Sequence, residues 1–313
     1  MQEYLYVINY PPYEEELCEM EFQSLFHEKM ISKYFITNKE IDFYRSAFIR
    51  LRITILKTSN HFKELVQYVQ NKHFTYYDFK VEYLKNETTH VPYKQTIEYC
   101  KQIALPIDGS VNMHHPKVII ILTKIDDLWI LGIQNINDQW DKNENKPYTY
   151  SSSLSLKLAR TLVNIGIEND THLKVIDPCC GIGTVVLEAL SMGVNIKGCD
   201  ISREVSYQAR LNLEHFGYNP LIINKMDMHK IKEQYDVCLL DIPYGLYCKY
   251  SEEQQNDIVK STLHFTKKLV LVSGRKMNKY LESIGYKIIN QCQVGKNESM
   301  DMIRYVTVCI RGK

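Results

Sequence analysis

The sequence predicts an α/β protein whose C-terminal half is a doubly wound, mostly parallel sheet, preceded by a separate α+β module. Three observations predict this. Strand and helix patterns alternate from residue 174 onward, as in sheets with helices on both faces. A glycine turn at residues 177–184 joins the first of these strands to a helix. The last two strand candidates are joined by a polar loop without a helix, so they are expected to form an antiparallel hairpin.

The elements of the C-terminal half follow from short apolar runs and from helical periodicity. Strands are expected at residues 174–177, 195–200, 221–225, 236–241, 269–273, 286–294 and 304–311. Helices are expected between the early ones, at residues 184–192, 203–216, 254–266 and 276–284. A further helix at 154–165 precedes the sheet, and the serines at 151–153 are expected to cap it. The polar segment 138–147 is interpreted as a linker.

The N-terminal half is less regular. Strands are expected at residues 3–9, 47–56, 77–84, 117–123 and 128–133, and the last two form a hairpin. Helices are expected at residues 14–26, 61–69 and 96–105. These elements predict an α+β module of its own.

Composition narrows the class of protein only a little. With 313 residues, 45% hydrophobic residues and 24% charged residues, the chain is typical of a soluble globular protein of two or three domains. The net charge of +1 neither supports nor excludes a nucleic-acid partner. The nine cysteines have no CxxC spacing, which favours free thiols and predicts no metal site. No apolar run reaches the length of a membrane span, so a cytoplasmic protein without membrane contact is expected.

The glycine turn reads Asp-Pro-Cys-Cys-Gly-Ile-Gly-Thr and opens a helix. Glycine at 181 and 183 lets the chain bend sharply and lets a ligand approach the backbone. A dinucleotide fingerprint needs a third glycine, and position 186 is Val. The carboxylate of Asp177 at the strand end would repel a pyrophosphate but suits a cationic ligand such as S-adenosylmethionine, whose sulfonium and ammonium groups are positive.

Two further acids end the next two strands. Asp200 can accept hydrogen bonds from ribose hydroxyls, and Asp227 can bind an adenine amino group, with Met228 packing on the ring. Each acid alone is more often a solvated loop residue or a helix cap. Three acids at the carboxyl ends of successive strands lie where ligands bind in open α/β sheets. Together they predict a binding site for S-adenosylmethionine.

The fourth strand runs directly into Asp241-Ile242-Pro243-Tyr244. An ordinary turn after a strand explains the proline but not the acid before it or the tyrosine after it. The lone pair of an aromatic amine is delocalised, and two acceptors on its N–H groups favour a nucleophilic, pyramidal nitrogen. The Asp241 carboxylate and the Ile242 carbonyl supply such acceptors, Pro243 restricts the backbone, and Tyr244 can stack on an extruded base. The tetrapeptide predicts methylation of an exocyclic amino group.

With the glycine turn, this tetrapeptide resembles the amino-directed methyltransferases of DNA, RNA and protein. More narrowly, the chain resembles the tRNA guanine-N2 methyltransferases that carry an N-terminal THUMP domain and include enzymes modifying guanosine at position 10 of tRNA. Three stretches carry this resemblance, residues 146–164, 177–184 and 296–304. Residues 79–132 resemble a THUMP domain more loosely. The family usually has a second proline where this chain has Ile242, and Ile supplies the same backbone carbonyl.

The resemblance implies a Rossmann-like class I methyltransferase sheet of seven strands after a ferredoxin-like and THUMP region. The implied division is residues 1–57 ferredoxin-like, 58–137 THUMP-like and RNA-binding, 138–152 linker and 153–313 methyltransferase. It implies S-adenosylmethionine as methyl donor and tRNA as substrate, and an activator subunit is not predicted. The expected cofactor-binding residues are Asp177, Pro178, Cys180, Gly181, Gly183, Thr184, Asp200, Ile201, Asp227, Met228 and Asp241.

Two other functions stay open from the sequence. A DNA or RNA adenine-N6 methyltransferase shares the tetrapeptide, although this chain has no long inserted segment for target recognition and its extra module is N-terminal. A non-catalytic RNA-binding protein with a remnant methyltransferase fold would not need the acids and the tetrapeptide that are all present. The modified nucleotide, the number of methyl groups added and the oligomeric state do not follow from the sequence.

Overall fold

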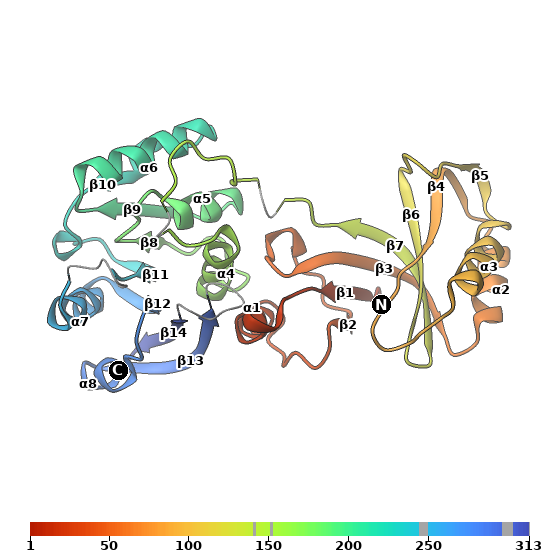
Figure 1. Cartoon of the computed structure of the whole chain (residues 1–313), viewed down its shortest axis with the longest axis horizontal. Coiled ribbons are helices and arrows are strands. Elements are labelled where there is room, and N and C mark those ends of the chain that lie inside the picture. The colour runs from red at the N-terminus through yellow and green to blue at the C-terminus, as the bar shows by residue number, and fades with distance from the viewer. Residues whose placement is uncertain (140–141, 151–152, 244–249, 296–302, 313) are drawn as a thin grey trace. The chain divides into compact units, whose positions relative to one another are not determined.

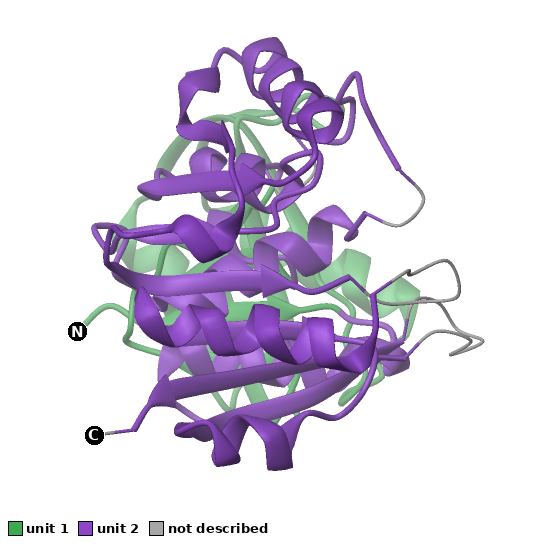
Figure 2. Cartoon of the chain, turned by 90° about the vertical axis from the view of Figure 1, so that its left-hand side faces the viewer, with its two compact units in different colours: residues 1–9, 31–43, 49–137 green, residues 10–30, 44–48, 138–313 purple. Residues whose placement is uncertain are grey.

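The computed structural model describes residues 1–139, 142–150, 153–243, 250–295 and 303–312. Two compact units make up the chain, shown in green and purple in Figure 2. The N-terminal unit contains residues 1–9, 31–43 and 49–137. The C-terminal unit contains residues 10–30, 44–48 and 138–313, so the chain passes between the units several times before residue 49.

The C-terminal unit is built on a seven-stranded sheet. Its strand order is β10-β9-β8-β11-β12-β14-β13, with all neighbours parallel except the pairs made by β14, which is antiparallel to both β12 and β13. The strands, labelled in Figure 1, are β8 (Val175–Asp177), β9 (Ile196–Asp200), β10 (Ile223–Lys225), β11 (Tyr235–Asp241), β12 (Thr266–Ser273), β13 (Tyr286–Gly295) and β14 (Ile303–Arg311). The predicted sheet and its C-terminal hairpin are confirmed.

Helices cover both faces of this sheet because the central strands are apolar on both sides. A Cβ added to Gly166 in α4 (Leu156–Ile167) would meet the side chains of Val237 and Leu239, so this helix packs tightly on one face of β11. The alternate residues Cys238 and Leu240 belong to a buried cluster with side chains from α7 (Glu252–Ser261) and α8 (Asn278–Ser283). Helices α5 (Thr184–Ser191) and α6 (Arg203–His215) follow β8 and β9 along the chain.

Helix α1 (Glu15–Phe26) belongs to the C-terminal unit although it lies near the start of the chain. Its Glu21 is 1% exposed and accepts hydrogen bonds from the backbone N–H of Ala47 at 3.1 Å and from the Asn164 side chain in α4 at 2.8 Å. The Ser46 hydroxyl donates to the same carboxylate. A buried carboxylate surrounded by donors is stable only while those donors stay in place. This polar seam therefore ties three distant segments into one unit.

A buried ion pair joins α4 to α5. Arg160 in α4 donates to Glu188 in α5 at 2.7 Å, and both side chains are almost fully buried. Arg160 also donates to the carbonyl of Arg45 at 2.9 Å, and Asn143 donates to Glu188 at 2.8 Å. Asn143 lies in the predicted linker, so part of that polar segment packs inside the C-terminal unit.

The N-terminal unit also contains seven strands in one sheet, in the order β2-β1-β3-β7-β6-β4-β5. Its strands are β1 (Tyr4–Ile8), β2 (Tyr34–Thr37), β3 (Ile49–Ser59), β4 (Thr75–Tyr83), β5 (Asp108–Val111), β6 (Val118–Ile125) and β7 (Leu128–Ile136). Helices α2 (Phe62–Lys72) and α3 (Tyr93–Ala104) contribute Leu65, Val69 and Ile103 to the core beneath this sheet. Strands from both predicted N-terminal parts share this one sheet, and the ferredoxin-like and THUMP-like division stays a prediction.

Several predicted boundaries were wrong for identifiable reasons. Ser155 rather than the run at 151–153 caps α4, through its side chain and the N–H of Leu158, and Ser151 and Ser152 lie outside the described residues. The helix expected to reach residue 266 ends earlier, because Thr266 already pairs with Tyr235 of β11. A strand was expected at 221–225, but its first residues form a 3₁₀ helix (Pro220–Ile222). This helix begins at Pro220 and is capped by the side chain of Asn219. Strands β2 and β5 were missed because short edge strands carry little periodicity.

No described helix is long and apolar enough to cross a membrane. No group of three or more described His, Cys, Asp or Glu side chains is placed to hold a metal ion. The eight cysteines that the structure describes are free thiols, six of them buried.

The seam at Glu21 predicts a specific loss of stability. We expect Glu21→Ala to lower the free energy of unfolding by about 3 kcal/mol, because it leaves buried donors without an acceptor. Urea unfolding followed by circular dichroism measures this change. Glu19→Ala, at an exposed position of the same helix, is the control and is expected to change stability by roughly 0.5 kcal/mol at most. Equal effects of the two substitutions would contradict the role of the seam.

Candidate active site

The candidate site lies at the carboxyl ends of the central parallel strands. Strand order reverses between β8 and β11, because β8 leads outward to β9 and β11 leads to β12. In open α/β sheets a ligand binds beyond the carboxyl ends of the strands at such a switch point. Asp177 ends β8 and Asp241 ends β11. The fold thus places these two acids on either side of the switch point.

Burial makes Asp177 unusual. The residue is 3% exposed, and burial, together with the negative charges of Asp241 and Asp200, raises the pKa of its carboxyl group well above the ordinary value. The Cys179 N–H donates to its carboxylate at 3.3 Å and opposes this shift. A cationic ligand at the strand ends would stabilise the ionised form of Asp177.

The glycine turn between β8 and α5 is shaped as the sequence predicts. Gly181 and Gly183 have φ of +53° and +84°, a region that other residues rarely adopt. A Cβ at Gly181 would meet no atom within 4 Å, whereas one at Gly183 would lie 3.4 Å from the side chains of Ala209 and Leu213 in α6. Gly181 therefore leaves space for a ligand beside the backbone, and Gly183 allows close packing of the helix.

Asp200 connects the end of β9 to this turn. Its carboxylate accepts hydrogen bonds from the N–H of Gly181 at 3.1 Å and from the N–H of Ser202 at 2.8 Å. Burial nevertheless raises the pKa of Asp200. The next residue, Ile201, is 58% exposed, which is high for a large apolar side chain beside a site. An apolar surface next to a hydrogen-bonding acid suits a nucleoside, with the base on Ile201 and the ribose on Asp200.

Asp227 differs from Asp177 and Asp200 because its carboxylate contacts a histidine side chain. Its carboxylate accepts hydrogen bonds from the backbone N–H of His229 at 3.0 Å and contacts the His229 ring nitrogen at 2.7 Å. The other ring nitrogen lies 2.9 Å from the carboxylate of Asp257 in α7. The hydrogen bond from His229 lowers the pKa of Asp227, and this bond raises the pKa of His229. Met228 is 5% exposed and its sulfur lies 3.6 Å from that of Cys179.

Backbone groups of Cys180 and Pro178 form hydrogen bonds within the protein. Cys180 is buried, and its N–H donates to the Cys199 carbonyl at 2.9 Å, while the Pro178 carbonyl accepts from the Cys199 thiol at 3.3 Å.

The side-chain hydroxyl of Thr184, at the start of α5, is buried and has no hydrogen-bond partner in the described part of the chain. An unsatisfied buried hydroxyl beside the open glycine turn fits a polar group of a ligand.

The predicted amino-acceptor loop, Asp241 to Tyr244, is described as far as Pro243, and Tyr244 lies outside the described residues. Asp241 pairs with Val272 of β12, and the N–H of Ile242 donates to the Val272 carbonyl at 3.2 Å. Ile242 is 1% exposed, in the core under α7. The carbonyl of Pro243 accepts a hydrogen bond from Gln255 at 2.9 Å. The sequence carried no signal for Gln255, which reads as one polar residue among several in a helix.

The chain matches a known family over this unit. Residues 144–277 match the family described as "RMKL-like, methyltransferase domain". These residues therefore resemble the methyltransferase domain of that family. The predicted recognition of a methyltransferase is therefore confirmed, and the match begins within the polar segment before α4.

Curated relatives are 25–29% identical to the chain over the segments that align. It is 29% identical over 162 residues to the tRNA (guanine(10)-N2)-dimethyltransferase of Methanothermobacter thermautotrophicus, covering 49% of this chain and 48% of that protein. It is 25% identical over 211 residues to the protein of the same name from Pyrococcus abyssi, covering 63% of each chain. The matches thus span less than two thirds of these relatives' own lengths.

A solved structure resembles the whole chain. TrmN from Thermus thermophilus has 14% sequence identity and a TM-score of 0.51, and the alignment covers 99% of both chains. At this identity the likeness concerns the fold alone. The predicted class I methyltransferase fold is confirmed, whereas the THUMP assignment stays a prediction.

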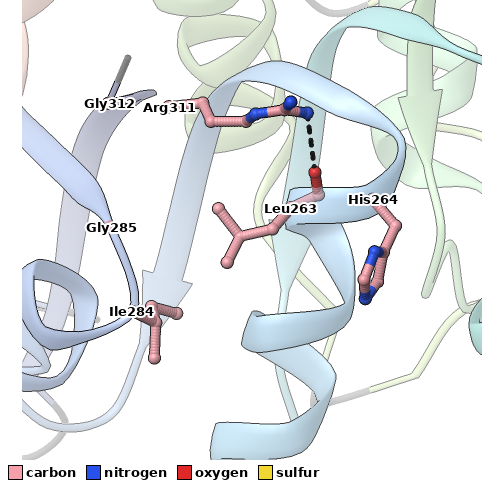
Figure 3. Close-up of a pocket in the computed structure, with 6 residues that line it drawn as sticks. All are labelled: Leu263, His264, Ile284, Gly285, Arg311 and Gly312. Atoms are coloured by element: carbon pink, nitrogen blue, oxygen red, sulfur yellow. Dashed lines mark hydrogen bonds between the residues drawn. The ribbon is translucent and has the colours of Figure 1, made fainter.

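A pocket elsewhere in the methyltransferase unit does not compete with this site. It is lined by Leu263, His264, Ile284, Gly285, Arg311 and Gly312, and Arg311 donates to the Leu263 carbonyl at 3.0 Å (Figure 3). Leu263 and His264 precede β12, so the pocket lies at the amino end of this strand. The acids end their strands at the opposite edge of the sheet.

The raised pKa of Asp177 predicts a pH-dependent stability. The carboxyl group of Asp177 keeps its proton to a higher pH in the folded protein than in the unfolded chain. The stability that this protonation contributes is complete below about pH 4 and is lost as the pH rises through the raised pKa of the folded protein. Asp177→Asn mimics the protonated form. We expect it to raise the thermal midpoint of the ligand-free protein by roughly 2–4 °C at neutral pH and much less in acid.

The matched control is Asp236→Asn, near the amino end of β11. A hydrogen bond from Lys267 lowers the pKa of Asp236, so its ionised form stabilises the fold and its replacement is expected to lower the thermal midpoint at neutral pH. Scanning calorimetry at several pH values compares the two variants. A lower midpoint for Asp177→Asn at neutral pH would refute the assignment of Asp177 as a destabilising buried acid.

Proposed function

We propose that this protein transfers a methyl group from S-adenosylmethionine to the exocyclic N2 of a guanosine in tRNA, at position 10. The observation that carries the proposal is the placement of Asp241 and Ile242 beside Asp177 at the switch point of a methyltransferase sheet. The curated relatives are named tRNA (guanine(10)-N2)-dimethyltransferases, which supports the choice of substrate. We further propose a cytoplasmic location, where tRNA is modified by such enzymes.

The residues present fit S-adenosylmethionine. Asp177 suits its positive charge, Asp200 and Ile201 suit the ribose and the adenine ring, and Gly181 leaves room at the turn. The buried Thr184 hydroxyl can satisfy a polar group of the donor. When bound, the donor supplies an electrophilic methyl group on a sulfonium. Asp227 and Met228 remain proposed contacts to the adenine, although His229 already occupies part of the Asp227 carboxylate.

The acceptor side is formed by Asp241 and Ile242. The carboxylate of Asp241 and the carbonyl of Ile242 are proposed to accept the two N–H groups of the guanine amine, which concentrates its lone pair toward the methyl group. The Ile242 N–H donates to the carbonyl of Val272. The ring of Pro243, the next residue, restricts the φ angle of that residue. No strong general base is needed, because the proton leaves a cationic product. Catalysis then consists mainly of positioning for in-line attack.

Substrate identity is tested by methyl transfer to defined nucleic acids. The pure protein is incubated with labelled S-adenosylmethionine and either unmodified tRNA or duplex DNA, and the nucleosides are separated after digestion. We expect label in N2-methylguanosine or N2,N2-dimethylguanosine from position 10. Label in N6-methyladenosine would favour the adenine-directed alternative, and donor binding without transfer would favour a non-catalytic RNA-binding protein.

The role of Asp241 predicts a sharp kinetic loss. We expect Asp241→Ala to lower kcat by about 10²–10³, the loss typical of removing one stabilising group from an active site. The dissociation constant of S-adenosylmethionine is expected to change by less than about fivefold, roughly 1 kcal/mol, because Asp177 and Asp200 remain. Single-turnover kinetics and calorimetric titration measure the two quantities.

Asp236→Ala is the control, since Asp236 lies on the same strand at the opposite edge of the sheet. It is expected to leave methyl transfer within about twofold of wild type, as for a surface ion pair worth under 1 kcal/mol. Wild-type turnover by Asp241→Ala would remove Asp241 from the mechanism.

A further inference from the structure

The amino-acceptor loop is held by a side chain from helix α7. The Nε2 of Gln255 donates to the carbonyl of Pro243 at 2.9 Å, across twelve positions of sequence. This carbonyl belongs to the peptide that links Pro243 to Tyr244. Gln255 is 9% exposed, so water competes poorly for the bond. The direction in which the chain leaves Pro243 therefore depends on Gln255.

Arg275 determines which way the Gln255 amide faces. The guanidinium Nε donates to the Oε1 of Gln255 at 3.4 Å, and the Nη2 donates to the Asn256 side chain at 2.8 Å. Arginine carries only donors, so the oxygen of the amide must point toward Arg275 and its nitrogen toward Pro243. Arg275 thus donates to Gln255, and Gln255 donates to the Pro243 carbonyl, so the two hydrogen bonds run in one direction.

Gln255 itself is placed by the start of α7. Ser251 caps this helix, and a capping box with Gln254 satisfies the first backbone donors. The N–H of Gln255 donates to the Ser251 carbonyl at 3.0 Å. On the inner side of the helix, Ile258 and Val259 are buried in the core cluster that also contains Ile242. The cap and the packing of α7 together fix the position of Gln255 relative to Pro243.

The Ile242 carbonyl lies between two fixed points. On one side the Ile242 N–H is bonded to Val272 of β12, and on the other the Pro243 carbonyl is bonded to Gln255. Proline restricts the torsion between them. An acceptor carbonyl held in this way is preorganised for an incoming N–H group, which lowers the cost of reaching the reactive geometry.

We propose that Gln255 is a positioning residue for methyl transfer, acting on the Ile242 carbonyl through the Pro243 peptide. This inference rests on the proposed function, in which the Ile242 carbonyl accepts a hydrogen bond from the substrate amine. Among the described residues, Gln255 forms hydrogen bonds with Pro243, Arg275 and Ser251, and none with Asp177 or Asp200. Its loss is therefore expected to affect turnover and to spare donor binding.

The test compares the same substitution at two neighbouring glutamines. In Gln255→Glu the donor to Pro243 becomes an acceptor, and kcat is expected to fall about 10–100-fold, because a displacement of about 1 Å can cost that much. The KM for S-adenosylmethionine is expected to stay within about twofold, under 1 kcal/mol. In Gln254→Glu the capping box keeps a suitable side chain, so kcat and KM are expected to stay at wild-type values.

A readout without turnover accompanies the kinetics. Hydrogen exchange of the backbone N–H of Ile242 is expected to accelerate in Gln255→Glu and not in Gln254→Glu. Gln255→Met removes the donor without adding a charge, and is expected to behave like Gln255→Glu, with a smaller loss of kcat. If Gln255→Glu does not fold, Gln255→Met is compared with Gln254→Glu in its place.

Two outcomes overturn the inference. Wild-type kcat and wild-type exchange at Ile242 in Gln255→Met would show that Gln255 does not hold the loop. A loss shared equally between kcat and donor KM would show a general structural role. If the wild-type protein itself does not methylate guanosine N2, the proposed function fails. The exchange comparison then still decides whether Gln255 positions the loop.

Discussion

The crowding of Asp200 and Asp241 around the buried Asp177 at the switch point is the constraint on which the candidate site depends. Asp177 is buried within electrostatic range of Asp200 and Asp241, and burial together with their charges raises its pKa. Backbone N–H groups of Cys179, Gly181 and Ser202 compensate only in part. An arrangement that costs stability in the free protein and favours a cation when one binds is characteristic of a ligand site rather than of a structural core.

The surrounding fold supplies rigidity to this site. The central strand β11 is apolar on both faces, with α4 on one side and α7 and α8 on the other. The buried Glu21 and the Arg160–Glu188 pair join α1, α4 and α5 into one polar seam. Such seams are specific rather than strongly stabilising, because their charges are desolvated. They explain why residues 10–30, far from the matched domain in sequence, belong to its compact unit.

Much of this architecture could be predicted because it depends on local chemistry. Alternation of apolar runs and helical periods predicts the strands and helices, and the absence of a helix before the last strand predicts the hairpin. Positive φ at Gly181 and Gly183 follows from the turn itself. The edge strands β2 and β5 were missed because they are short, and the cap of α4 was misplaced among four neighbouring serines. The proposed roles of the site residues, Tyr244 among them, stay predictions.

By itself, the sequence determined the order of the elements, the acids at the strand ends and the Asp241-Ile242-Pro243 acceptor loop, since each is encoded within a few consecutive residues. Only the tertiary structure decided that Asp177 is deeply buried, that α1 closes the polar seam, that His229 bridges Asp227 and Asp257, and that Gln255 donates to the Pro243 carbonyl. These contacts join residues that are many positions apart. They depend on how whole helices pack against the sheet, which no local pattern of residues specifies.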